Sequence, residues 1–135
     1  MKLRALKEIL NLKDKLENMF FLRESFMTML KEVKPAEYPD WPVDLTNKRH
    51  QQHIRDMSLR GVEEMFEALQ HLKNWKPHRD TEVKDFDKDE FLEEVVDAFN
   101  YFLSVLVLTG IDAETFFDAY TKKDKVIRDR LKSGY

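Results

Sequence analysis

The sequence predicts an all-α helical bundle, and three observations favour this fold class. The 135 residues include only three glycines and four prolines, which leaves little turn material for many short strands. Apolar residues recur at helical spacing in four long segments, separated by polar or proline-containing connectors. Hydrophobic residues make up 42% of the chain, which argues against disorder despite 36% charged residues. We therefore expect about four main helices in a single domain spanning residues 1–135.

The first helix is expected from Leu3 to about Val33, because its apolar positions follow the helical repeat. These positions include Leu6, Leu10, Leu16, Met19, Phe20, Met27 and Leu30. Residues 34–45 contain three prolines, which favour an extended connector over a continued helix.

A second helix is expected from a cap at Thr46 or Asn47 to about Lys73. Its apolar residues, which we predict to face inward, are Ile54, Met57, Met65, Phe66, Leu69 and Leu72. Residues 74–86 are polar and contain a proline, so they are expected to form the second long connector.

Asp87 followed by Glu90 resembles a capping box, which would open a third helix that ends at Gly110. Apolar residues cover well over half of the circumference of this helix in residues 91–108, so we expect it to be buried on most sides. Asp112 is expected to cap a fourth helix. Its predicted inward residues are Ala113, Phe116, Phe117, Tyr120 and Ile127.

Two acidic pairs are the most informative feature of the chain. Glu64 and Glu67 are one helical turn apart, as are Glu94 and Asp97, so both acids of a pair leave the same side of their helix. With 26 acids in the chain, either pair alone is most often a solvated helix face. However, the polar stripe of the third helix is narrow, and an acid there needs a partner. If the two helices face each other, four carboxylates converge, and a hard divalent ion such as Mg²⁺ would neutralise them.

Other metal chemistries fit the sequence less well. A di-iron bundle requires Glu-x-x-His on two helices, but Gln70 and Asn100 occupy the corresponding positions. The absence of cysteine excludes a zinc–thiolate site and a cysteine nucleophile. The four histidines show no zinc-ligand spacing, and we predict surface positions, or supporting positions beside other ligands, for His50, His53, His71 and His78.

Charge and hydropathy restrict the partners. The net charge of −3 gives no reason to expect a nucleic-acid partner. The longest apolar stretch, residues 101–108, is too short to cross a bilayer, and the first residues lack a signal-peptide core, so a cytoplasmic location and no membrane partner are expected. Lys123 and Arg130 are seven residues apart on one side of the last helix, where they would suit a triphosphate. An ordinary cationic last turn explains them equally well.

Together these motifs resemble a known family. The order Glu64-x-x-Glu67, a spacer, then Glu94-x-x-Asp97 resembles the all-α nucleoside triphosphate pyrophosphatases of the MazG-like superfamily. Residues 120–135 are similar to the tail of the dimeric dUTPases and the phage dCTP/dUTP pyrophosphatases. The segment 73–76, Lys-Asn-Trp-Lys, is similar to the K-x-W-K stretch between their acidic pairs. The resemblance covers residues 60–135.

The resemblance implies a role for each matching residue. Glu64, Glu67, Glu94 and Asp97 would be the Mg²⁺ ligands, with Glu67 accepting the proton of the attacking water. Asn100 falls where dimeric dUTPases carry a base-side histidine. Lys123 and Arg130 would hold the phosphates. The remaining residues expected near the nucleotide are Trp75, Lys76 and Tyr135.

The resemblance also implies a homodimer or higher homo-oligomer whose partner completes the pocket, located in the host cytoplasm if the protein is phage-encoded. The expected reaction is Mg²⁺-dependent hydrolysis of dUTP, dCTP or both to the monophosphate and pyrophosphate. Asp124, Ile127 and Leu131 depart from the family pattern, which leaves the preferred base open. Two alternatives remain: a pyrophosphatase for a purine or damaged deoxynucleotide, and a non-catalytic helical interaction module.

Overall fold

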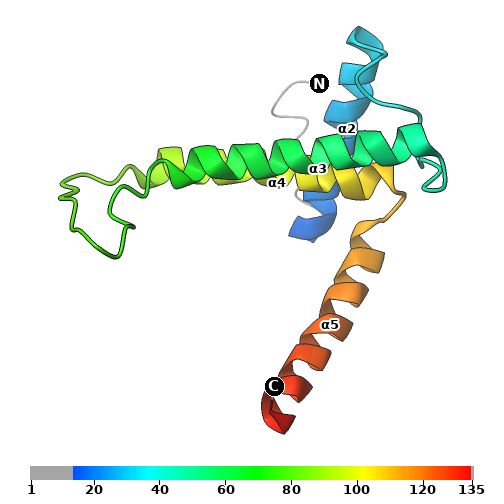
Figure 1. Ribbon diagram of the computed structural model, residues 1–135. Coiled ribbons are helices and arrows are strands. Elements are labelled where there is room, and N and C mark those ends of the chain that lie inside the picture. The colour runs from blue at the N-terminus through cyan, green and yellow to red at the C-terminus, as the bar shows by residue number, and fades with distance from the viewer. Residues whose placement is uncertain (1–13, 135) are drawn as a thin grey trace.

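A computed structural model describes residues 14–134, and the regular structure within this range is helical (Figure 1). The four helices are α2 (Lys15–Val33), α3 (Lys48–Leu69), α4 (Lys88–Leu108) and α5 (Ala113–Ser133). The predicted all-α class is confirmed. The predicted helical residues 3–13 lie outside the described part of the chain.

Three of the predicted capping residues begin their helices. Each side chain accepts a hydrogen bond from the backbone N–H three residues later, at 2.8–3.1 Å: Asn47 for α3, Asp87 for α4 and Asp112 for α5. These bonds satisfy backbone donors that a helix start leaves unpaired. At the other end of α4, Gly110 has φ +75°, a conformation that glycine adopts without strain.

The predicted end of α3 is about one turn too late. The helix ends at Leu69 rather than near Lys73. The N–H groups of His71 and Leu72 donate to carbonyls three residues earlier, at 3.1 and 3.0 Å. These tighter turns keep His71 close to the end of α3, which matters for the site described below.

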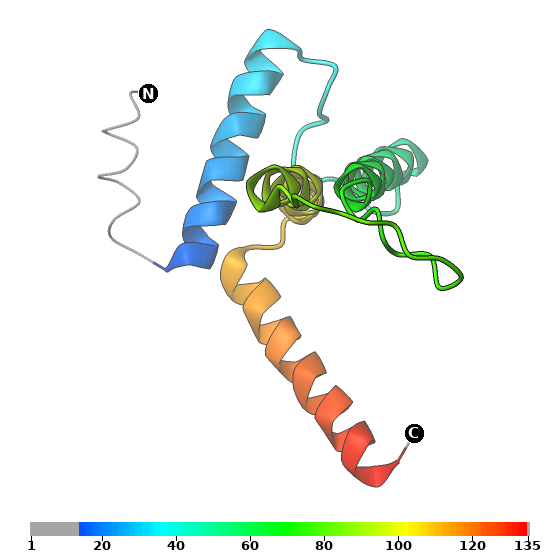
Figure 2. The ribbon, with the colours of Figure 1, turned by 90° about the vertical axis from the view of Figure 1, so that its left-hand side faces the viewer.

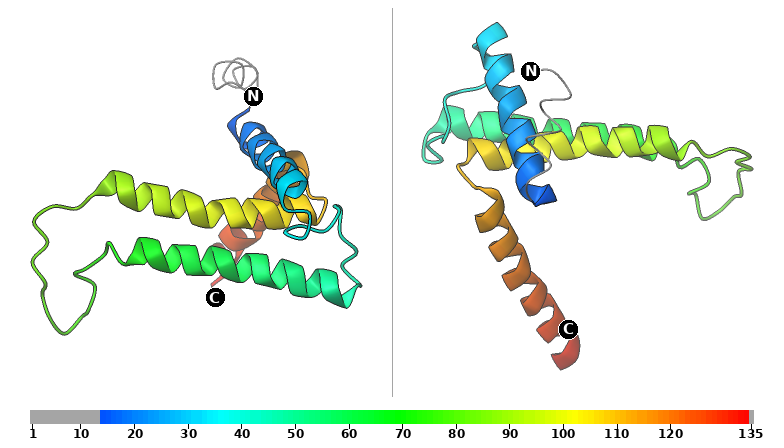
Figure 3. Two further views of the ribbon diagram at one scale, coloured as in Figure 1. Left: turned by 90° about the horizontal axis from the view of Figure 1, so that it is seen from above. Right: turned by 180° about the vertical axis from the view of Figure 1, so that it is seen from behind.

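α3 and α4 form an antiparallel pair that lies side by side along most of its length (Figure 3). The connector 70–87 joins them at one end, and α2 crosses α4 near the other (Figures 1 and 2). α5 begins near this crossing, bends away from α4 by 107° and contacts α2. No single described helix has the length and apolar character that a membrane span requires; α4 and α5 meet that test only jointly, across their bend.

The core is concentrated where α2 crosses the pair. The backbone N–H of Val43 donates to the Leu108 carbonyl at 2.8 Å and fixes the 34–47 connector against the end of α4. The buried apolar residues gathered there are Phe20, Met27, Tyr38, Val43, Met57, Leu103, Val107, Leu108 and Ala113. The part of α3 and α4 nearer the 70–87 connector is therefore a two-helix pair, which none of the other described helices covers.

Small residues allow α3 and α4 to approach closely. Gly61, Ala68 and Ala98 are buried between the helices. A Cβ atom on Gly61 would lie 2.8 Å from Cε1 of Phe102, closer than two carbon atoms can pack. Gly61 therefore leaves space on α3 for the ring of Phe102.

We expect Gly61→Leu to lower the free energy of unfolding by about 1–3 kcal/mol, because the larger side chain would push Phe102 and α4 away. Urea unfolding followed by circular dichroism measures this change. Gln52→Leu is the matched control, because it adds the same side chain at an exposed position of α3. Equal stability of the two variants would contradict the close approach at Gly61.

Several residues predicted to face inward are exposed. These are Phe66 and Leu69 on α3, Leu72 in the turn after α3, and Phe117, Tyr120 and Ile127 on α5. α4 also exposes Leu92, Val96 and Phe99, although we predicted burial on most sides. For the single chain these predictions are wrong. The physical reason is that α5 diverges from α3 and α4, so no helix within residues 14–134 covers these faces.

Candidate metal centre

The antiparallel register brings the two acidic pairs to the same level of α3 and α4. His71 Nε2 lies 3.9 Å from Oε1 of Glu94, and the ring of Phe102 lies beside Gly61. Between these two contacts, the helical rise places Glu67 opposite Asp97. The four acids Glu64, Glu67, Glu94 and Asp97 are called the acidic cluster below.

Electrostatics indicate that the four carboxylates interact. The pKa of Glu64 is raised above its ordinary value, first because partial burial disfavours the charged form. Repulsion from Glu67 and a hydrogen bond to it raise the pKa further, and the charges of Asp97 and Glu94 add to the effect. The structure therefore brings the predicted ligands together, while their role as ligands stays a prediction.

The raised pKa of Glu64 makes stability depend on pH. Without divalent ions, the folded protein holds the Glu64 proton more tightly than the unfolded chain does. The free energy of unfolding therefore falls as the pH rises from the ordinary pKa of a carboxyl group through the raised pKa of Glu64. We expect Glu64→Gln to be more stable than wild type in EDTA at about pH 7.5, and the difference to vanish near pH 4, where both side chains are neutral.

Denaturant titrations at the two pH values, with and without Mg²⁺, measure this effect. Mg²⁺ should reverse the order at the higher pH, because it stabilises the charged wild-type cluster through binding to the native state. A wild type more stable than Glu64→Gln in EDTA at that pH would contradict the repulsion described here.

Glu94 has the most constrained position in the cluster. Its Oε2 atom is buried and has no hydrogen-bond partner among the described residues, while the side chain as a whole is 24% exposed. A buried carboxylate oxygen without a donor is unfavourable. A divalent cation would satisfy it, and the oxygen donors of the cluster fit the preference of Mg²⁺.

The cations predicted to hold the phosphates lie elsewhere. Lys123 and Arg130 are exposed on α5, which points away from the α3–α4 pair (Figure 1). Their neighbour Arg128 forms an ion pair with Asp124 within the same helix, at 2.7 Å. Within one chain, the structure does not bring the cations of α5 to the acidic cluster.

Two other arginines lie along the polar side of the pair. Arg60 is one turn before Glu64 on α3 and forms ion pairs with Glu37 at 2.7 Å and Asp56 at 3.0 Å. Arg23 reaches across from α2, its Nε donates to the Ser104 hydroxyl at 2.7 Å, and burial lowers its pKa. Sequence reasoning missed both. Arg60 is four residues before Glu64, so the sequence alone could have placed it on the same side of α3. The position of Arg23 depends on how α2 crosses α4, which the sequence does not show.

The other predicted nucleotide contacts are spread along the pair. Asn100 is half-buried on α4, one turn from Asp97. Trp75 is 67% exposed in the connector 70–87, and Nζ of Lys76 lies 5.8 Å from the centre of its indole ring. Tyr135 lies outside the described residues.

His71 was predicted to be a surface or supporting residue, and it contacts the acidic cluster. It follows Glu64 by seven residues and so continues the same stripe of α3 as Glu64 and Glu67. That spacing was the signal available in the sequence. Glu90 also lies near His71 and Glu94.

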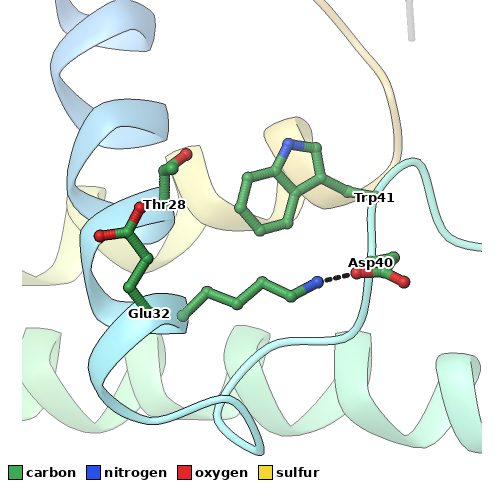
Figure 4. A pocket seen from close by; sticks show the side chains of 5 residues that line it. Thr28, Glu32, Asp40 and Trp41 are labelled. Carbon is green, nitrogen blue, oxygen red and sulfur yellow. Dashed lines mark hydrogen bonds and ion pairs between the residues drawn. The ribbon is translucent and has the colours of Figure 1, made fainter.

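Two hollows on the surface contain none of the acidic cluster. One lies between α2 and the 34–47 connector, where Lys31 pairs with Asp40 and its Nζ lies 5.4 Å from the centre of the Trp41 ring (Figure 4). The other lies at the N-terminal end of α5. It is lined by apolar residues and by acids, which include Glu17 and Glu114. Both are open to solvent and belong to the α2 end of the molecule.

Comparison with known proteins returned no match: no family model, no curated protein and no solved structure is similar to this chain at a significant level. The functional argument therefore rests on the residues of the acidic cluster and on their surroundings.

Proposed function

We propose that the protein hydrolyses a deoxynucleoside triphosphate, dUTP, dCTP or both, to the monophosphate and pyrophosphate in a Mg²⁺-dependent reaction in the cytoplasm. The observation that carries the proposal is the mutual interaction of the four carboxylates Glu64, Glu67, Glu94 and Asp97 on facing helices. Such a set of oxygen donors suits a hard divalent ion, and triphosphate chemistry commonly requires one.

Each acid has a role that its position suits. Glu94 and Asp97 from α4, with Glu64 and Glu67 from α3, would hold Mg²⁺. When bound, Mg²⁺ would supply charge neutralisation for the phosphate oxygens and would acidify a water molecule. Glu67 is exposed, so it can reach solvent and accept the proton of the attacking water.

The proposed substrate-binding residues are those that the family resemblance implies, with Arg60 added. Asn100 offers both a donor and an acceptor beside the cluster, so it can read uracil or cytosine. Trp75, Lys76 and Tyr135 would lie near the nucleotide. Arg60 is the cation nearest in sequence to the acidic pair of α3, and Lys123 and Arg130 would reach the phosphates from a second copy of the chain.

A second copy is supported by the surface of the chain. Its accessible area is 11042 Å², whereas a compact monomer of 16.2 kDa exposes about 7,500 Å². The chain is therefore less compact than an ordinary monomer of its mass, which leaves a large area for contact with a second copy. One continuous apolar stripe on the pair, called the outer apolar face below, consists of Val62, Phe66 and Leu69 of α3 with Leu92, Val96 and Phe99 of α4.

The outer apolar face leaves the acids accessible. Phe66 is two residues from Glu64, and Phe99 is two residues from Asp97, which is about 200° around each helix. A second copy packed on this face would form a four-helix core from two helical pairs, with the carboxylates directed away from it.

The same exposed face favours a second candidate, a helical interaction module without catalysis. The two candidates differ in metal binding, because the module has no need of Mg²⁺. Thermal unfolding with a non-hydrolysable dUTP or dCTP analogue separates them: the proposal predicts an upward shift of Tm only when Mg²⁺ and the analogue are both present. No shift with any deoxynucleotide analogue, pyrimidine or purine, would favour the module. A shift with purine analogues alone would indicate a pyrophosphatase for another deoxynucleotide, a damaged one included.

A further inference from the structure

Three ligand-type side chains gather at the end of the α3–α4 pair, beside the connector 70–87. His71 comes from the turn after α3, and Glu90 and Glu94 come from the first two turns of α4. One potential ligand atom from each residue lies within 4.8 Å of the other two. His71 Nε2 lies 3.9 Å from Oε1 of Glu94.

We propose that His71, Glu90 and Glu94 bind a divalent transition-metal ion at a position next to the acidic cluster. Metal–nitrogen and metal–oxygen bonds of about 2.0–2.2 Å allow two ligands on one ion to be up to about 4.3 Å apart. The separation between His71 and Glu94 is within this limit. Glu90 is exposed, so its side chain is free to close the remaining few tenths of an ångström.

The surroundings hold these residues in place. The ring of Phe91 meets the His71 imidazole edge to face, with centroids 6.5 Å apart, and Phe86 packs on Phe91 at 5.6 Å. The backbone of Glu90 is fixed by the cap of α4, where its N–H donates to Asp87 at 3.0 Å. Oε1 of Glu94 faces His71, and the buried Oε2 atom lacks a hydrogen-bond partner among the described residues, so a cation bound to this carboxylate would stabilise its charge.

The donor set determines which ion fits. An imidazole nitrogen with two carboxylates suits borderline ions such as Co²⁺, Mn²⁺ and Zn²⁺, whereas Mg²⁺ prefers oxygen ligands alone. Three protein ligands also leave positions open for water or phosphate oxygens. The inference shares Glu94 with the proposed Mg²⁺ site, but it does not depend on turnover of any nucleotide.

Titration of the full chain with Co²⁺ alone, followed by visible absorption and calorimetry, tests the proposal. We expect saturable binding with absorption bands typical of a nitrogen-containing ligand set. His71→Ala should weaken Co²⁺ binding at least about tenfold, with smaller effects on Mg²⁺ binding. His78→Ala is the matched control, because it removes an exposed histidine from the same connector and should leave Co²⁺ binding unchanged.

Glu67→Gln separates this inference from the proposed function. This variant should still bind Co²⁺ at His71 even if it has lost Mg²⁺-dependent activity. Circular dichroism verifies that the helices of each variant are intact. Co²⁺ affinity that is the same in wild type and His71→Ala, or a wild type that binds no Co²⁺, would overturn the proposal, whatever the outcome of the nucleotide assays.

Discussion

Glu67→Gln is expected to lower kcat for deoxynucleotide hydrolysis by about 10²–10⁴-fold, because it removes the base that accepts the proton of the attacking water. The substitution keeps the shape of the side chain and removes one charge from the acidic cluster. Since Glu67 is exposed, the fold should be retained, so helix content by circular dichroism should equal that of wild type. Pyrophosphate release under saturating Mg²⁺ measures the change.

Glu63→Gln is the matched control for this prediction. Glu63 is an exposed acid one turn before Glu67 on the same helix, and it is not one of the four acids of the acidic cluster. Its replacement should change kcat by no more than about twofold, as is usual for surface positions. Full activity of Glu67→Gln would remove Glu67 from the mechanism, and equal losses in both variants would point to a general effect of charge.

Replacing Phe66 and Phe99 together by glutamate is expected to convert the proposed dimer into monomers. Both side chains are more than half exposed in the single chain, at 59% and 53%, and both belong to the outer apolar face. Each buried aromatic anchor of an interface contributes about 2 kcal/mol, and a symmetric dimer contains both anchors twice. The loss of about 8 kcal/mol should raise the Kd of the dimer about 10⁵–10⁶-fold. Sedimentation velocity over a range of protein concentrations measures the change.

Val33→Glu is the control for the apolar face. Val33 is 76% exposed at the end of α2 and lies outside the outer apolar face, so its replacement should leave the dimer intact. If the second copy supplies Lys123 and Arg130, the Phe66/Phe99 variant should lose activity together with dimerisation. A wild-type protein that sediments as a monomer at high concentration would contradict the proposed interface.

Much of the fold could be predicted from local sequence signals. The capping side chains Asn47, Asp87 and Asp112 act within three residues of their partners, so their role is readable without knowledge of the fold. The spacing of the acidic pairs likewise predicts one helix side for each pair. That the two sides interact depends on the antiparallel register, which small residues such as Gly61 permit.

The direction of the apolar faces could not be predicted in the same way. Helical periodicity identifies the apolar side of α3 and of α5, but it does not say whether the same chain or another chain covers it. Phe66 and Phe117 therefore looked like core residues, although both are exposed in the single chain. The partners of His71 could not be predicted for a different reason: Glu90 and Glu94 are distant from it in the sequence and meet it only through the pairing of the helices.

The most direct test of the central claim is a turnover screen of the purified full chain against all common deoxynucleoside and ribonucleoside triphosphates, with and without Mg²⁺, with both products identified. The acidic cluster predicts release of pyrophosphate and a deoxynucleoside monophosphate, dependent on Mg²⁺ and greatest for dUTP or dCTP. Absence of turnover for every nucleotide, in a folded protein supplied with Mg²⁺, would contradict the account.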